Sequence, residues 1–213
     1  FRIQHLEIIC DGNLREEQIR EYTGLREGLN LFAFSFSDIE ERLGKVPNVE
    51  SVELERELPS TLYVRVKERV PVARIMIKNY KIPRLLDRYG VVLPPRSSAS
   101  LARLPLIKGL ESDVRIGAPV ENRDIDTVLE IVALCESKRY LQTYIPIDSL
   151  DIKYSDFIDM RLTGGTRVKM PRYRLSPKLQ ELATIIKMAG EQGKRVKEVD
   201  LTLESPKAPV RYY

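Results

Sequence analysis

The sequence has few of the residues that build common catalytic and metal sites. His5 is the only histidine among 213 residues, which excludes histidine triads, multi-histidine zinc sites and His-Cys dyads that need a second histidine. The two cysteines, Cys10 and Cys135, lie far apart, and Cys135 falls on the apolar face of an expected helix. That position favours a buried free thiol over a disulfide. We therefore predict no catalytic residue, no cofactor and no metal ligand.

Long apolar runs and dense basic blocks are also missing. No stretch reaches the roughly 18 apolar residues that a membrane-spanning helix needs, and no charged-then-apolar leader opens the chain. Phe1 stands first instead of methionine, so we expect a fragment or processed form from which an anchor has been removed. Basic and acidic residues number 35 and 31. This near balance, without stacking aromatics among basic runs, disfavours nucleic-acid binding.

The clearest local pattern runs from Pro59 to Ala73. Leu62, Val64 and Val66 alternate with polar or amphipathic residues, which predicts a strand with one buried face. Pro71 then withholds a backbone N–H and favours extended geometry before it, so the ladder should stop there. The stretch indicates the last strand of an N-terminal unit, followed by a hinge.

The preceding residues complete that unit. Residues 1–10 and 49–56 alternate as strands, and two short amphipathic helices are expected between them. Asn13 with Glu16, and Ser37 with Glu40, are the expected helix caps. The order is β-α-α-β-β within about 70 residues, which predicts one small sheet covered by two helices.

The remainder is strand-rich and predicts a larger domain. Residues 85–87 and 91–93 indicate a hairpin, and residues 94–104 a mobile loop. Helices are expected over 124–140 and from Ser176 to Gly193. Further strands are expected over 150–153, 157–162, 166–170, 195–203 and 208–213, so the fold class is α+β with residues 1–70 and 71–213 as domains.

The ordered motifs resemble one bacterial family. They include Gly12, Gly24-Leu25, Gly28, Pro47, Arg56 and the run Val66-Lys67-Glu68-Arg69-Val70-Pro71-Val72-Ala73. Leu86-Asp87, Tyr89-Gly90-Val91-Val92, residues 104–109 and Val199-Asp200-Leu201 continue the pattern. Over nearly the whole chain the sequence resembles the FtsQ/DivIB family of division proteins, with a POTRA domain followed by a β domain.

The resemblance implies a non-enzymatic scaffold on the periplasmic face of the bacterial inner membrane, at the division septum. The full-length protein would be anchored by a single membrane helix upstream. It implies FtsB and FtsL as partners, with FtsB adding a strand to the C-terminal edge of the β domain. The POTRA domain would serve recruitment of other division proteins.

The expected partner-binding segment is the exposed edge of the final strand. Unpaired N–H and C=O groups along such an edge can accept a partner strand, although Pro209 would block it locally because it cannot donate. The family pair Asp200-Leu201 is present, but Thr202-Leu203 replaces its usual Arg-Tyr. The predicted partner-binding residues are Leu203, Ser205, Ala208, Val210, Arg211, Tyr212 and Tyr213.

Two other functions fit the sequence less well. A POTRA-containing peptide-binding module of outer-membrane protein assembly would usually carry several POTRA units and barrel strands. An acid-base hydrolase would need a carboxylate pair such as Glu40-Glu41 or Asp124 with Asp126. Both pairs are expected at helix starts, where negative charge stabilises the helix dipole without any catalytic role.

Overall fold

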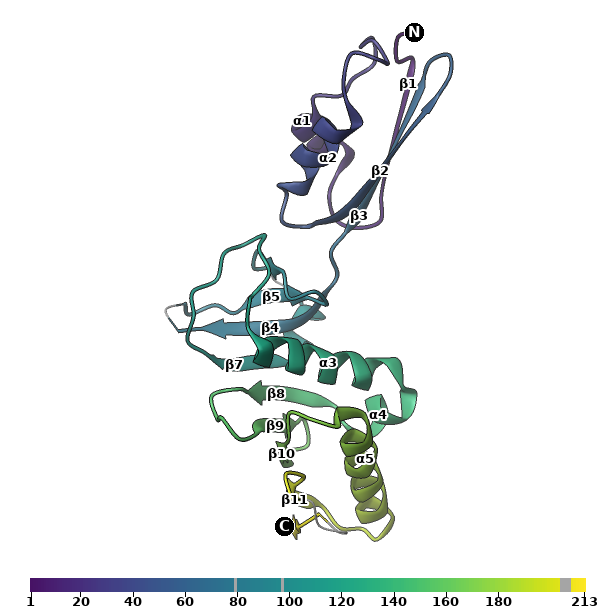
Figure 1. Ribbon diagram of the computed structural model, residues 1–213. Helices are drawn as coiled ribbons and strands as arrows, with labels where there is room; N and C mark the ends of the chain where they lie inside the picture. The colour runs from purple at the N-terminus through teal and green to yellow at the C-terminus, as the bar shows by residue number, and fades with distance from the viewer. Residues whose placement is uncertain (79, 97, 204–207) are drawn as a thin grey trace. The chain divides into compact units, whose positions relative to one another are not determined.

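The chain consists of two units, each with its own buried core. The computed structural model describes residues 1–78, 80–96, 98–203 and 208–213 (Figure 1). The first unit is Phe1–Val70 and the second is Pro71–Tyr213. The apolar side chains form separate clusters in the two units.

The first unit has the predicted β-α-α-β-β order. Its elements are β1 (His5–Cys10), α1 (Glu16–Thr23), α2 (Phe36–Gly44), β2 (Val49–Glu57) and β3 (Thr61–Glu68). Strand β3 lies in the middle of the sheet, parallel to β1 and antiparallel to β2. Leu62, Val64 and Val66 of β3 point into the core, as the alternation predicts. The ladder ends at Glu68, before Pro71.

Both expected helix caps are wrong. Helix α1 begins after Arg15, whose N–H donates to Gln18 Oε1 at 3.0 Å. Helix α2 begins after Ser35, whose hydroxyl accepts from the Ser37 N–H at 3.2 Å. Asn13 does not cap α1, and the N–H of the next residue, Leu14, donates to a distant carboxylate. The sequence alone does not reveal that contact.

That carboxylate belongs to Glu68, which is only 4% exposed. It accepts hydrogen bonds from the Leu14 N–H and, at 3.8 Å, from the Cys10 thiol. The Glu68 N–H in turn donates to Asp11 Oδ1 at 2.8 Å. A Cβ on Gly12 would collide with the Glu68 carboxyl group, so a larger residue there would displace this carboxylate. Glu68 thus fastens the turn between β1 and α1 to the end of β3.

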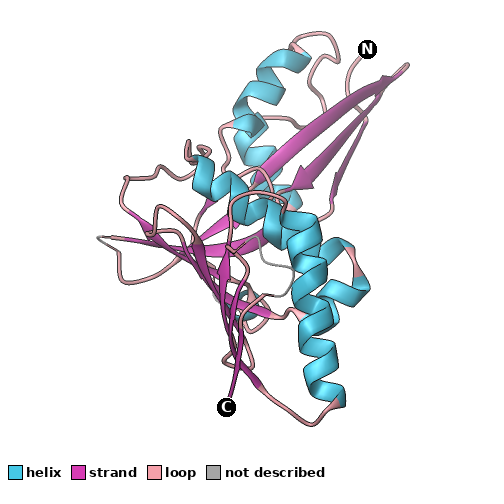
Figure 2. Cartoon of the chain, turned by 60° about the horizontal axis from the view of Figure 1, so that its bottom comes forward, coloured by secondary structure: helices cyan, strands magenta, loops and turns pink. Residues whose placement is uncertain are grey.

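The second unit is a mixed sheet with helices on one face. Its strands are β4 (Pro71–Ile77), β5 (Arg84–Asp87), β6 (Val92–Leu93), β7 (Leu106–Leu110), β8 (Ile147–Asp151), β9 (Ile158–Leu162), β10 (Arg167–Met170), β11 (Val196–Asp200) and β12 (Val210–Tyr212). Within the described residues they form one nine-stranded sheet, in the order β12-β11-β10-β9-β8-β7-β4-β5-β6. Helices α3 (Arg123–Ser137), α4 (Arg139–Tyr144) and α5 (Leu175–Glu191) pack against a single face (Figure 1, Figure 2).

The helix expected over 124–140 is interrupted. Lys138 has extended backbone angles and separates α3 from α4. The side chain of Asn122 caps α3 by accepting from the Asp124 N–H at 2.8 Å. Cys135 is a buried free thiol, as expected, and burial raises its pKa to about 12. The α+β class is confirmed.

We expect Glu68→Ala to destabilise the first unit by about 1–3 kcal/mol, because it removes a buried carboxylate and leaves the partly buried Leu14 N–H without this acceptor. Urea unfolding followed by circular dichroism measures the change. Glu53→Ala, an exposed glutamate on β2, is the matched control and should stay within about 0.5 kcal/mol of wild type. Equal effects of the two substitutions would contradict the proposed role of Glu68.

Candidate functional site

The last strand lies at one end of the large sheet. Strand β12 pairs antiparallel with β11, with Val210 opposite Val199, Arg211 opposite Glu198 and Tyr212 opposite Val196. Among the described residues no strand pairs with its other side. The C-terminal segment is therefore an edge strand.

The backbone bonds show which groups point away from β11. Pro209 O accepts from the Asp200 N–H at 3.1 Å, and the Tyr213 N–H donates to Arg195 O at 3.1 Å. In an antiparallel ladder the N–H and C=O of alternate residues face the same side. Residues 209, 211 and 213 therefore face β11. The N–H and C=O of Val210 and Tyr212 face outward.

This register changes the expected effect of Pro209. The sequence predicts a local block because proline lacks a donor. Its carbonyl points to Asp200, so its nitrogen lies on the β11 side as well. Proline therefore lacks an N–H only on the side of the strand that faces β11. On the outward side the N–H groups of Val210 and Tyr212 are still present. The expectation of a block at the outer edge is wrong for this reason.

The opposite end of the sheet is covered by the chain itself. Strand β6 exchanges hydrogen bonds with the segment after β7: the Val92 N–H donates to Ala118 O at 3.0 Å, and the Gly117 N–H donates to Val92 O at 2.8 Å. Val91 also forms a bridge with Pro119. The two ends of the sheet therefore differ, and the β12 end is the candidate for a partner strand.

The side chains of the terminal segment divide between two surfaces. Ala208 and Val210 pack against the core. Arg211 lies on the other face, 80% exposed, with Nη1 3.5 Å from Glu198 Oε2. Tyr212 and Tyr213 are 46% and 70% exposed. Both rings lie beside cations: Lys194 is 5.6 Å from the Tyr212 centroid, and Lys197 and Arg195 are 5.7 and 5.5 Å from that of Tyr213.

Two predicted site residues precede this segment. Leu203 follows β11 and is 50% exposed. Ser205 lies outside the described residues. The structure thus brings Ala208, Val210, Arg211, Tyr212 and Tyr213 together at the edge.

The face of the sheet opposite the helices carries charged side chains in register. Arg161 of β9 lies directly opposite Arg167 of β10, and Asp159 opposite Asp151 of β8. Like charges placed opposite each other are unfavourable. Arg167 instead pairs diagonally with Asp159, Nε to Oδ1 2.8 Å, and Asp159 is only 7% exposed. These residues and Lys108 line a polar hollow of about 470 Å³.

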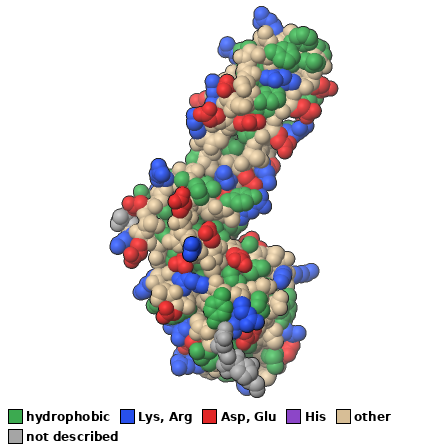
Figure 3. Space-filling model, in the orientation of Figure 1, with side chains coloured by type: hydrophobic (Ala, Val, Ile, Leu, Met, Phe, Trp, Pro, Cys, Tyr) green, Lys and Arg blue, Asp and Glu red, His purple; other side chains and the backbone are tan. Residues whose placement is uncertain are grey.

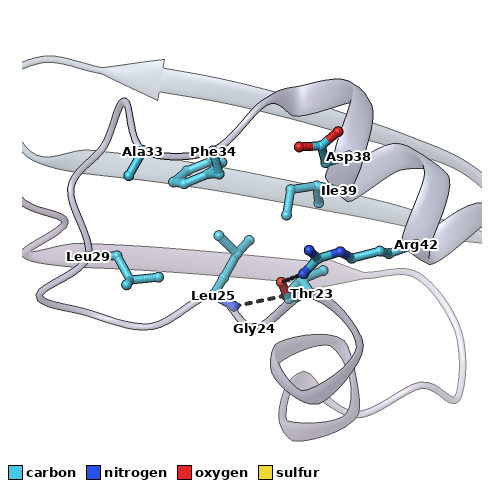
Figure 4. A pocket seen from close by; sticks show the side chains of 9 residues that line it. All are labelled: Thr23, Gly24, Leu25, Leu29, Ala33, Phe34, Asp38, Ile39 and Arg42. Atoms are coloured by element: carbon cyan, nitrogen blue, oxygen red, sulfur yellow. Dashed lines mark hydrogen bonds between the residues drawn. The ribbon is translucent and has the colours of Figure 1, made fainter.

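A smaller, more apolar pocket lies in the first unit (Figure 4). It has a volume of about 240 Å³ and lies between the end of α1, the start of α2 and the loop that joins them. Leu25 and Ile39 supply buried apolar walls. Arg42 Nη1 donates to Thr23 O at 3.0 Å at its rim. Sequence reasoning missed both hollows, because each depends on contacts between distant segments.

The carboxylate pairs considered for catalysis lie on two helices, α2 and α3. Asp124 lies in the first turn of α3 and binds Arg172, Nε to Oδ1 2.6 Å. Glu40 and Glu41 lie inside α2, not at its start. Across the described residues, no cluster of three or more His, Cys, Asp or Glu side chains could hold a metal ion. None of the helices in that part of the chain is long and apolar enough to cross a membrane.

The fold and comparisons with known families define the class of protein. Residues 1–69 match the POTRA domain of FtsQ type, and residues 73–202 match the C-terminal domain of the cell division proteins FtsQ and DivIB. The chain is thus an FtsQ-type POTRA domain followed by a β-rich domain. It belongs to the FtsQ/DivIB family of cell division proteins.

Individual relatives agree with this assignment. The chain is 30% identical to cell division protein FtsQ of Geotalea daltonii over 206 residues, covering 94% of this chain and 72% of that protein. It is 26% identical to FtsQ of Geobacter sp. strain M21, covering 94% and 73%. With DivIB of Clostridium botulinum strain Hall it shares 26% identity, covering 58% and 48%. These matches favour the division family over the outer-membrane assembly alternative.

The charged face yields a stability prediction. Arg167→Met should destabilise the second unit by about 1–3 kcal/mol, because the nearly buried Asp159 carboxylate loses its partner. Arg161→Met removes the like charge opposite Arg167 and should be neutral within about 0.5 kcal/mol, or slightly stabilising. Urea unfolding distinguishes the two variants. A cost for Arg161→Met as large as that for Arg167→Met would contradict the pairing described.

Proposed function

We propose that this chain is a non-enzymatic scaffold of the bacterial division complex that binds FtsB- and FtsL-like partners. FtsB would add a strand to β12, at the C-terminal edge of the β domain. In this proposal residues 1–70 form the POTRA domain, which can contact further division proteins, and residues 71–213 form the β domain. The protein would act at the septum, on the periplasmic face of the inner membrane, anchored by a helix upstream.

One observation carries the proposal: β12 ends the sheet with the backbone groups of Val210 and Tyr212 facing outward. Such groups bind an incoming strand through main-chain hydrogen bonds, and side chains choose the partner. A covered edge would leave no place for a strand. The hydrogen-bonded cover at β6 therefore favours β12 over the other end.

The side chains beside β12 favour a particular partner sequence. Val210 and Tyr212 share the helix-covered face, so partner residues next to them should be apolar. Lys197 and Arg195 lie beside Tyr213, and Arg211, paired with Glu198, lies on the opposite face. Partner residues there should be acidic, because complementary charge steers association and fixes register. The strand should therefore alternate apolar and acidic residues.

Strand addition alone buries too little surface for a stable complex. Strand β12 has three residues, whereas stable interfaces bury about 1,200–2,000 Å² in total. Neighbouring surfaces must contribute, and α5 packs beside β11. Its Met188 side chain is 53% exposed and is suited to an adaptable apolar contact.

Deletion of Ala208 to Tyr213 should abolish binding of an FtsB peptide, because the accepting strand is removed. The expected loss in affinity is at least about tenfold, or 1.4 kcal/mol. Fluorescence anisotropy with a labelled peptide measures it, and circular dichroism checks that the fold is retained. Undiminished binding by the folded, shortened chain would contradict the proposal.

Tyr212→Pro tests the backbone without removing the strand. Proline deletes one outward N–H but not a bond to β11, and proline is tolerated on edge strands. Tyr212→Ala keeps the N–H and removes the same ring, so it is the matched control. We expect Tyr212→Pro to bind the FtsB peptide about fivefold or more weakly than Tyr212→Ala, the cost of one hydrogen bond of about 1 kcal/mol. Equal affinities would show that backbone pairing at this position is not used.

A further inference from the structure

Two phenylalanines of the first unit, Phe1 and Phe32, lie at its surface, and Phe34 and Phe36 pack partly buried against its core. The buried core of that unit, all of whose residues are described, consists of Ile, Leu and Val side chains. Four of the five phenylalanines in the chain lie in this unit, and all four are at least partly exposed. We call Phe1, Phe32, Phe34, Phe36 and the adjacent Arg56 the aromatic tip.

Arg56 holds the aromatic tip in a defined shape. Its Nε donates to Leu31 O at 2.9 Å and its Nη2 to Phe34 O at 2.8 Å. The guanidinium carbon lies 4.0, 5.2 and 5.6 Å from the ring centroids of Phe36, Phe34 and Phe32. These are cation–π distances, so a positive charge lies among the rings.

The loop that carries the rings is also fixed by its own backbone. Leu31 is fully buried, and its N–H donates to Phe1 O at 2.9 Å. The Asn30 side chain accepts from the Phe32 N–H at 3.0 Å. Phe32 and Phe34 are therefore presented by an ordered loop.

Two rings of the aromatic tip are mainly in solvent. Phe1 is 68% and Phe32 is 55% exposed, and they meet edge to face with centroids 5.6 Å apart. Leu58, two residues after Arg56, is 59% exposed. Figure 3 shows hydrophobic side chains next to basic ones at the end of the first unit that carries the N-terminus. Large apolar side chains gathered on a surface mark an interaction site.

The chemistry of the aromatic tip fits one kind of partner. We infer that it inserts into the interfacial layer of an anionic lipid bilayer. Exposed apolar rings partition into the boundary between headgroups and acyl chains. Guanidinium groups of Arg56 and of the exposed Arg2, whose Nη1 lies 3.2 Å from Gly28 O, are attracted to anionic headgroups. The two exposed rings, Phe1 before β1 and Phe32 on the loop before α2, lie outside the helices and strands, so they can enter a bilayer without rearrangement of the fold.

Vesicle binding tests this inference. The 213-residue chain should co-sediment with phosphatidylglycerol vesicles and much less with phosphatidylcholine vesicles. The double variant Phe1→Ser, Phe32→Ser keeps every charge, so a purely electrostatic attraction would leave its binding unchanged. We expect binding to phosphatidylglycerol to weaken at least about tenfold. The matched control is Tyr89→Ser in the second unit, an exposed ring with Arg88 4.7 Å from its centroid; it should bind as wild type does.

A spectroscopic probe reports insertion directly. The chain contains no tryptophan, so Phe32→Trp and Tyr89→Trp each introduce a single fluorophore. On addition of phosphatidylglycerol vesicles, emission from Phe32→Trp should shift to shorter wavelength and be quenched by brominated lipid, and emission from Tyr89→Trp should do neither. The inference is overturned by no response at position 32, by equal responses at both positions, or by unchanged vesicle binding in the double serine variant.

Discussion

An open β-sheet has two edge strands, and each leaves a row of N–H and C=O groups without hydrogen bonds to another strand. The rest of this structure depends on how the chain treats these two edges. At β6 the chain satisfies them with its own segment around Ala118. At β12 the described residues provide no further strand. The internal side of β12 is held by β11, and Val210 anchors it to the core. The edge is therefore both fixed in place and able to accept another strand.

The aromatic residues are distributed differently from the aliphatic ones. The cores of both units are built mainly from aliphatic side chains, and every tyrosine and phenylalanine in the chain is at least partly exposed. Several of these rings lie beside a cation, as Tyr213 does at the edge and Phe36 does next to Arg56. Aliphatic side chains thus form most of the two cores. Several of the aromatic rings lie at the surface beside a cation. Both proposed contact surfaces have this composition.

Local patterns in the sequence predicted much of the fold. The alternation of Leu62, Val64 and Val66, the β-α-α-β-β order and the edge segment after Pro206 required only short-range reasoning. The end of α3 at Lys138 and the cap at Ser35 were not predicted, because several residues nearby are equally plausible boundaries. The bond from Leu14 to Glu68 joins positions 54 residues apart, and no local signal announces it.

At the candidate site, too, short-range sequence patterns predict some features, and others depend on the pairing of distant strands. The sequence predicted an extended terminal segment, and β12 forms there from Val210 to Tyr212. That this segment binds a partner stays a prediction. The outward direction of the Tyr212 N–H, and the harmless orientation of Pro209, depend on the register with β11. The opposition of Arg161 and Arg167 likewise depends on strand pairing. Such registers are set by the whole sheet, so a single strand's sequence cannot supply them.

Amide hydrogen exchange at β12 tests the central claim most directly. Measured by NMR on the chain alone, the N–H of Arg211 should be protected by β11, and those of Val210 and Tyr212 should exchange quickly. On saturation with an FtsB peptide, the account predicts strong slowing at Val210 and Tyr212 and little change at Arg211. Exchange at Val210 and Tyr212 that stays fast in the saturated complex would contradict strand addition at this edge.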